Sequence, residues 1–109
     1  MPIDWGQVGL ATLVAAKNIV GANWAHVAIP AAEQIKALVA IGEHIEAEHA
    51  AGRMTQENYD MLRSMEKNAV EGVLSADKGI GIVIAEQAAA AAWDVVETAL
   101  GTVAGFAFV

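Results

Sequence analysis

Charged and apolar positions divide the chain into three segments. Of its 19 Asp, Glu, Lys and Arg residues, 14 lie within residues 33–78, which leaves an apolar, alanine-rich segment on each side. Apolar residues recur at spacings of three and four, a pattern typical of helices with one buried face. The pattern predicts a single all-α domain of four helices over residues 1–109, with an apolar N-terminal arm (1–32), a charged helical hairpin (33–78) and an apolar C-terminal helix (79–109).

The N-terminal arm predicts a helix that begins at an Asp4 N-cap and ends before Gly21. The stretch 22–29 fits either a continued helix or a connection. Proline is favoured in the first turn of a helix, where its missing N–H has no intrahelical partner to lose. We therefore expect a break or kink just before Pro30. The sequence leaves open whether residues 4–29 form one helix or two.

Two capped helices make up the predicted central hairpin. The first covers residues 31–51 and ends at Gly52, and the second begins at a Thr55 N-cap and runs to about Leu74. Apolar residues at helical spacing are expected to form the buried sides of both helices. They are Ile35, Leu38, Val39, Ile41, Gly42 and Ile45 in the first helix and Met61, Leu62, Met65, Ala69 and Val73 in the second.

The turn of this hairpin has a characteristic sequence. Residues 51–62 contain a glycine, the apolar Met54, the Thr55 cap, Glu57 and the aromatic Tyr59. This Gly-x-apolar-Thr-x-Glu pattern resembles the hairpin turn of the short oligomerisation modules called SHOCT domains. The resemblance is confined to the turn, and it implies a capped hairpin that takes part in self-association.

The C-terminal helix is predicted to begin after Asp77 and to continue toward the C-terminus. Its charged residues fall on one side at 100° per residue. They are Glu86, Asp94 and Glu97. Near its end, Gly101 and Gly105 form a Gly-x-x-x-Gly pair, a spacing that lets another helix approach closely.

Composition favours helix more strongly than membrane. The hydrophobic fraction is 56% and the mean hydropathy +0.43, but 24 of the 109 residues are alanine, a strong helix former that is only weakly hydrophobic. No uncharged apolar stretch reaches the roughly 18 residues of a spanning helix, and the acidic side of the C-terminal helix is costly in lipid. Membrane insertion is therefore expected only when several assembled copies turn that side toward one another.

The net charge of −7 makes a nucleic-acid binder improbable, because phosphate contacts need clustered Lys and Arg. The absence of cysteine removes disulfides and thiol chemistry. The first residues carry no positive charge of the kind that begins a secretory signal. We therefore expect the protein in the cytoplasm or in a particle assembled there. Membrane association stays an open alternative for the assembled protein.

One dense cluster of metal-ligand types occurs, formed by Glu43, His44, Glu46 and His49. Glu46-x-x-His49 has the spacing of di-iron four-helix proteins, in which ligands three residues apart share a helix face. Those sites repeat the motif, whereas it occurs once here. Glu46 and His49 are thus weak candidates beside the alternative of a solvated helix end, and no cofactor is expected. The isolated His26 is expected in the core or in an interface.

The candidates for packing within the chain or between copies are large residues of the apolar arms and the small residues near them. They are Trp5, Trp24, Trp93, Leu100, Gly101, Gly105, Phe106 and Phe108. The two phenylalanines are expected to dock either on the same chain or on a neighbour.

No catalytic triad, phosphate-binding glycine loop or metalloprotease motif occurs, so we do not expect an enzyme. The leading expectation is a structural, self-associating helical protein in a larger homo- or hetero-oligomeric assembly. Small internal or tail-associated bacteriophage virion proteins have this character, which is an analogy of type. A membrane-active protein of holin-like or pore-forming kind is the first alternative. A small carboxylate-histidine metal protein is the second.

Overall fold

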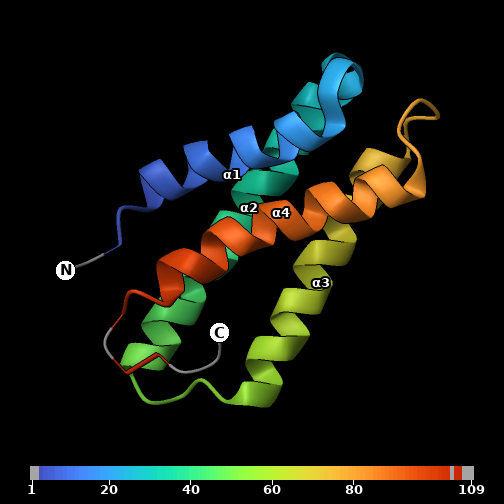
Figure 1. The fold of residues 1–109 in the computed structure, drawn as a ribbon. Coiled ribbons are helices and arrows are strands. Elements are labelled where there is room, and N and C mark those ends of the chain that lie inside the picture. Colours follow the sequence, from blue (N-terminus) through green and yellow to red (C-terminus); the bar gives the residue numbers. More distant parts are fainter. Residues whose placement is uncertain (1–2, 104, 107–109) are drawn as a thin grey trace.

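The structure is a computed structural model that describes residues 3–103, 105 and 106 (Figure 1). These residues form four α-helices and one short 3₁₀ turn, with no strand among them, which confirms the predicted all-α four-helix architecture. The elements are α1 (Trp5–Val20), the 3₁₀ turn η1 (Gly21–Asn23), α2 (Trp24–Ala50), α3 (Gln56–Ser75) and α4 (Ile82–Leu100).

Side-chain caps begin α1 and α3 where the sequence predicts them. The Asp4 carboxylate accepts a hydrogen bond from the backbone N–H of Gln7 at 3.2 Å, and the Thr55 hydroxyl accepts one from the N–H of Asn58 at 3.1 Å. Each bond satisfies a first-turn N–H that has no partner within the helix. Between α2 and α3, Gly52 adopts a φ of +75°, which a residue without Cβ tolerates best. The expected capped hairpin is present.

The expected break before Pro30 is wrong. α2 is one helix of 27 residues that passes through Pro30, and the chain reverses earlier, at η1, where Gly21 has a φ of +73°. Pro30 removes one intrahelical hydrogen bond. However, Pro30 lies on an exposed side of α2, while the adjacent Val27 and Ala31 are buried. Packing of these neighbours in the core holds the helix together across the missing bond.

α4 lies at the centre of the fold. Figure 1 shows it crossing the molecule between α1 and α3, and it contacts α2 as well. Its inward side consists largely of alanines that are at most 1% exposed. They are Ala85, Ala88, Ala89 and Ala92. Because these side chains are small, α1 can pack close to the α4 backbone.

The prediction that the last helix continues toward the C-terminus is wrong. α4 ends at Leu100, and successive turns reverse the chain, with Gly105 at a φ of +81°. The Phe106 ring then lies 4.9 Å from the His49 ring and 5.8 Å from the Tyr59 ring, measured between centroids. Phe106 therefore docks on the α2–α3 end of its own chain.

The buried side of α3 is rotated from the predicted one. Met61 and Met65, expected in the buried side, are 55% and 56% exposed, whereas Tyr59, Val70 and Leu74 are buried. The Tyr59 hydroxyl donates to a carboxylate of α4 at 2.9 Å. Because Tyr59 faces α4, the opposite side of α3 faces solvent. Positions 61 and 65 lie on that opposite side.

Candidate interaction surface

α1 carries its large aliphatic side chains on the outside. Its buried residues are Thr12, Ala16 and Val20, which recur at every fourth position. Leu10 and Val14 lie on the other side and are 61% and 53% exposed. A surface helix ordinarily buries its large apolar residues and exposes polar ones. α1 therefore presents to solvent the kind of surface that other helices bury.

The packing of α1 on α4 explains this arrangement. Thr12 and Ala16 are completely buried, and α1 makes its most extensive helix contact with α4, whose buried residues include four alanines. The Thr12 hydroxyl donates to the carbonyl oxygen of Val8 at 2.7 Å, so its polar group is satisfied within the helix. A leucine in place of these small residues would force the two helices apart. The close helix contact thus uses the small residues of α1 and leaves the large ones outside.

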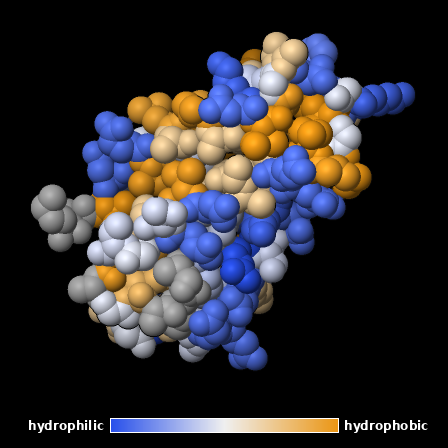
Figure 2. Space-filling view, viewed as in Figure 1, coloured by the Kyte–Doolittle hydropathy of each residue, from blue (hydrophilic) through white to orange (hydrophobic). Residues whose placement is uncertain are grey.

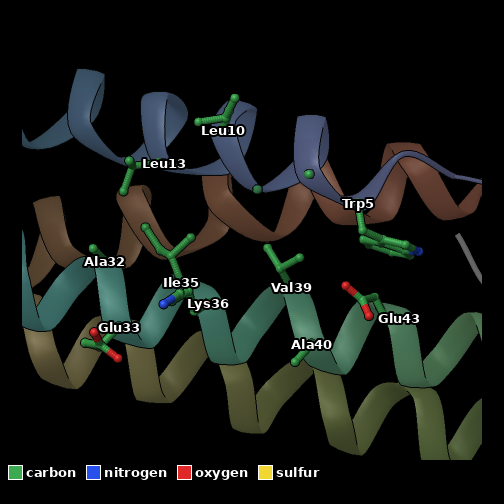
Figure 3. A pocket seen from close by; sticks show the side chains of 12 residues that line it. Trp5, Leu10, Leu13, Ala32, Glu33, Ile35, Lys36, Val39, Ala40 and Glu43 are labelled. Atoms are coloured by element: carbon green, nitrogen blue, oxygen red, sulfur yellow. The ribbon is translucent and has the colours of Figure 1, made fainter.

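An open groove of about 620 Å³ lies between α1 and α2 beside these residues (Figure 3). Figure 3 shows Leu13 pointing from α1 toward α2, and Ile35 and Val39 pointing from α2 toward α1. Gly9, which also lines the groove, adds no side chain to the α1 wall. Leu10 stands at the rim and points away from α2. The groove and its rim are mostly apolar.

Trp5 closes one end of the groove. Its indole N–H donates to Oε1 of Glu46 at 2.8 Å. The ring covers Gly42, where a Cβ atom would lie only 2.7 Å from a ring carbon. The hydrogen bond and the glycine together fix the start of α1 on α2, so the groove has a defined shape in the isolated chain.

Exposed apolar residues extend beyond the groove. Ile29 on α2 is 80% exposed, and Ile82 and Val83 at the start of α4 are 58% and 60% exposed. Figure 2 shows hydrophobic residues gathered over the upper half of this face, where α1 and the start of α4 lie, and mostly hydrophilic residues below. Single apolar residues are ordinary on a protein surface, but a gathered patch is typical of a contact surface.

The surface around α1 carries little net charge. Lys17 is the one charged residue within Trp5–Val20, and Glu33, Lys36 and Glu43 line the groove from α2. Together with Asp4 these charges sum to −1, in a chain whose net charge is −7. Opposite charges on this surface nearly cancel, so two such surfaces can meet with little repulsion.

A polar cluster joins α3 to α4 away from the groove. Tyr59 donates to Oε1 of Glu97, and Nη1 of Arg63 lies 3.5 Å from the same oxygen. Burial, followed by the hydrogen bond to Glu97, raises the pKa of Tyr59. Glu97 belongs to this cluster, so only Glu86 and Asp94 remain exposed on the predicted acidic side of the last helix.

The weak metal candidates are not brought together into a site. Glu46 accepts the Trp5 indole hydrogen bond, and Nε2 of His49 lies 3.2 Å from the carbonyl oxygen of Gly105. Among the residues that the structure describes, no group of three His, Cys, Asp or Glu side chains is placed to hold a metal ion.

His26 lies on the surface and not in the core. Its side chain is 62% exposed, and its Nδ1 lies 3.2 Å from Oδ2 of Asp77 in the α3–α4 loop. Nearby, the Asn23 amide donates to the carbonyl oxygen of Gly79 at 2.7 Å, and Asp77 accepts from the Gly79 N–H. These contacts fasten the α3–α4 loop to η1 and the start of α2.

Most of the large predicted packing residues are buried within the chain itself. They are Trp24, Trp93, Leu100 and Phe106, each at most 9% exposed. Trp5 is half-buried against α2. Phe108 lies outside the described residues. A contact between copies through the described residues therefore has to use other side chains.

The predicted Gly-x-x-x-Gly helix face does not form. Gly101 is the residue that ends α4, and Gly105 lies in the turn beyond it. The two glycines therefore do not share one helix face, although each is exposed. Their role is in the reversal of the chain that brings Phe106 onto α2 and α3.

Leu10 and Val14 were not among the predicted packing residues, although α1 contains a usable signal. Thr12 and Ala16 belong to a stripe of small residues at every fourth position, and the last helix contains a run of five alanines, Ala88–Ala92. Two stripes of small residues can pack closely on each other. When the small residues of α1 pack on α4, Leu10 and Val14 face outward.

The fold and this surface define the protein as a small four-helix domain with an exposed apolar face. The chain matches no protein-family model, no curated protein and no solved structure. None of the helices in the described part of the chain combines the length and hydropathy needed to cross a bilayer. The function is therefore inferred from the exposed surface itself.

Proposed function

We propose that the protein is a non-enzymatic, self-associating helical component of a homo- or hetero-oligomeric assembly. One observation supports this above the others: α1 exposes Leu10 and Val14 while it buries Thr12 and Ala16. Burying one large aliphatic side chain contributes about 1.5–3 kcal/mol relative to leaving it in water. A protein surface that covers α1 gains this free energy. The proposed role is therefore to make contacts and not to catalyse a reaction.

The interior of the single chain supports the same proposal. Trp93, Tyr59 and Leu38 are fully buried, so a core forms without help from a partner. Exposed aliphatic residues occur both on α1 and at the start of α4, at Ile82 and Val83. Together these residues give each subunit an extended apolar surface for contact. A subunit that folds alone and then assembles fits this arrangement.

The absolute mass of the purified protein tests the proposal. Light scattering after gel filtration is carried out in plain buffer and again in mild detergent. We expect a discrete oligomer in buffer whose mass detergent leaves unchanged. A monomer of 11.3 kDa at high micromolar concentration in both solvents would contradict self-association.

Membrane association is a second candidate that one observation favours. Small residues between helices with large aliphatic residues outside, as in α1 and α4, are the arrangement of helix pairs in lipid. On this candidate the protein would release dye from zwitterionic vesicles and form a discrete species in detergent only. The net charge of −7 disfavours anionic lipid. Dye retention together with an oligomer in plain buffer would reject the membrane candidate.

A further inference from the structure

We propose that two copies of the chain bind each other in antiparallel orientation through the outer side of α1 and the adjacent α1–α2 groove, with Lys17 of each copy paired to Glu43 of the other. The proposal of this contact rests on the proposed self-association and specifies the surface through which the copies associate. Its centre is formed by Leu10 and Val14, which are 61% and 53% exposed in the single chain.

Lys17 lies on the groove side of α1. Residues three, four and seven apart share one face of a helix. Leu10 stands on the rim of the groove and Leu13 lines it. Lys17 follows them at these spacings and is exposed. It is therefore the charge that a partner meets at the C-terminal end of α1.

Glu43 lies at the opposite end of the same surface. The Trp5 ring, at the start of α1, packs over Gly42, the chain neighbour of Glu43. Figure 3 shows Glu43 beside Trp5 at one end of the groove, while Leu13 lies toward the other end. From Trp5 to Lys17 the helix rises about 18 Å at its usual pitch. Figure 3 also shows Glu33 and Lys36 toward the Leu13 end. Lys17 and Lys36 outweigh Glu33 by one charge at that end, and Asp4 and Glu43 make the other end acidic.

Antiparallel pairing satisfies both ends at once. A two-fold axis across the middle of α1 places Lys17 of each copy over Glu43 of the other, and it brings the Leu10 and Val14 side chains of the two copies together. Parallel stacking would instead set Lys17 against its own equivalent. Charges at the rim of an apolar contact set its orientation, because like charges facing each other are unfavourable.

The distribution of charge favours a second copy over other occupants. The surface carries −1 of the net charge of −7, so the remainder of the chain carries −6. Two copies of this acidic chain repel each other least when these surfaces meet. A basic peptide would be attracted more strongly to the remainder. Anionic lipid would be repelled by the chain as a whole.

A stable dimer of standard size buries about 800 Å² per partner, which is about 13% of the 5981 Å² surface of one chain. The broad face of the molecule measures 42 × 25 Å, so a contact of that size extends beyond α1 over much of this face. Ile29, which is 80% exposed on α2, adds apolar area beyond the groove.

A charge exchange tests the antiparallel orientation. The dimer dissociation constant is measured by analytical ultracentrifugation for wild type, Lys17→Glu, Glu43→Lys and the double variant. We expect each single change to weaken the dimer about tenfold and the double variant to return to within about threefold of wild type. A double variant that is as weak as either single variant, or weaker, would overturn the proposed orientation.

The apolar centre is tested by Leu10→Asp with Met65→Asp as the matched control, since Met65 is 56% exposed but lies on α3. We expect Leu10→Asp to abolish the dimer and Met65→Asp to preserve it, both with the wild-type circular dichroism spectrum. An oligomer that survives Leu10→Asp rejects this contact while self-association stands. A wild-type protein that is monomeric rejects both this contact and self-association. An oligomer that forms only with vesicles or detergent would mean that lipid, and not a second copy, covers the surface.

Discussion

The indole ring of Trp5 occupies the space into which any side chain at Gly42 would project. A Cβ atom at Gly42 would lie 2.7 Å and 2.8 Å from two ring carbons and 2.9 Å from Cγ1 of Val96 on α4. These distances are far shorter than an ordinary carbon–carbon contact of about 3.5–4.0 Å. α1, α2 and α4 thus meet at a point that only glycine permits, and this point sets the closed end of the groove.

Gly42→Ala is therefore expected to destabilise the fold by about 1–3 kcal/mol, the usual cost of forcing an extra methyl group into a packed site. Gly72→Ala is the matched control, because Gly72 is also helical but has no heavy atom within 4 Å of its Cβ position. The control should stabilise by about 0.4–1 kcal/mol. Urea unfolding followed by circular dichroism measures both. Equal effects of the two changes would show that the Trp5 ring does not cover Gly42.

The hydrogen bond between the Trp5 indole and Glu46 is expected to contribute about 1 kcal/mol to the free energy of unfolding, since both groups are half-buried. A double-mutant cycle with Trp5→Phe and Glu46→Ala isolates this contribution. The two changes together should cost less than the sum of the single changes by that amount. Strict additivity in urea unfolding would indicate that the bond is absent in solution.

Local signals in the sequence predicted most of the fold. Asp4 and Thr55 act as caps through residues three positions away, so their effect can be recognised without tertiary structure. Gly21 likewise ends α1 at the predicted place. The expected break at Pro30 is wrong because the local preference of proline is outweighed by the burial of Val27 and Ala31 on the same helix.

The interaction surface was harder to predict, because it depends on which helix α1 packs against. Hydrophobic periodicity favours large aliphatic residues for the buried side of a helix, and the sequence alone assigns Leu10 and Val14 no role. The contact with the alanine-rich helix α4 buries Thr12 and Ala16 instead, since only small residues allow the two helices to approach closely. The buried tryptophans could be recognised as packing residues, but the sequence did not distinguish packing within one chain from packing between chains.

The half-buried Glu66 carries one buried oxygen without a partner in the described part of the chain. Oε2 of Glu66 has no hydrogen-bond partner among the described residues, and burial raises the pKa of this carboxyl group above its usual value. The folded chain then binds this proton more tightly than the unfolded chain does. The free energy of unfolding therefore decreases as the pH rises from the unfolded pKa through the raised folded pKa.

Glu66→Gln removes this ionisation, so the variant should melt at a higher temperature than wild type at pH 7 and should lose the advantage near pH 4. Thermal unfolding across this pH range measures the difference. Glu71→Gln, on the same helix, controls for the loss of one negative charge. A Glu66→Gln variant that is less stable than Glu71→Gln at pH 7 would mean that the carboxylate has a favourable partner in solution.

The single tyrosine of the chain provides a second test with an unambiguous signal. Burial and the hydrogen bond to Glu97 raise the pKa of Tyr59 above its usual value of 10.0. Because Tyr59 is the only tyrosine, the absorbance of tyrosinate near 295 nm reports this group alone. The folded protein should show no tyrosinate at a pH where the chain unfolded in urea already ionises at its ordinary pKa of about 10. A folded protein that ionises together with the unfolded chain would place the phenol in water.

The same group links stability to alkaline pH. Below pH 10 both states keep the proton, so Tyr59→Phe is expected to cost about 1–3 kcal/mol through the loss of the donor to Glu97. Above pH 10 the unfolded chain releases the proton and the folded chain retains it, so the wild-type free energy of unfolding should fall by about 1.4 kcal/mol per pH unit from this group. The phenylalanine variant lacks this decrease. The stability gap between the two proteins in urea unfolding should therefore narrow as the pH rises past 10, and a constant gap would mean that the phenol titrates alike in both states.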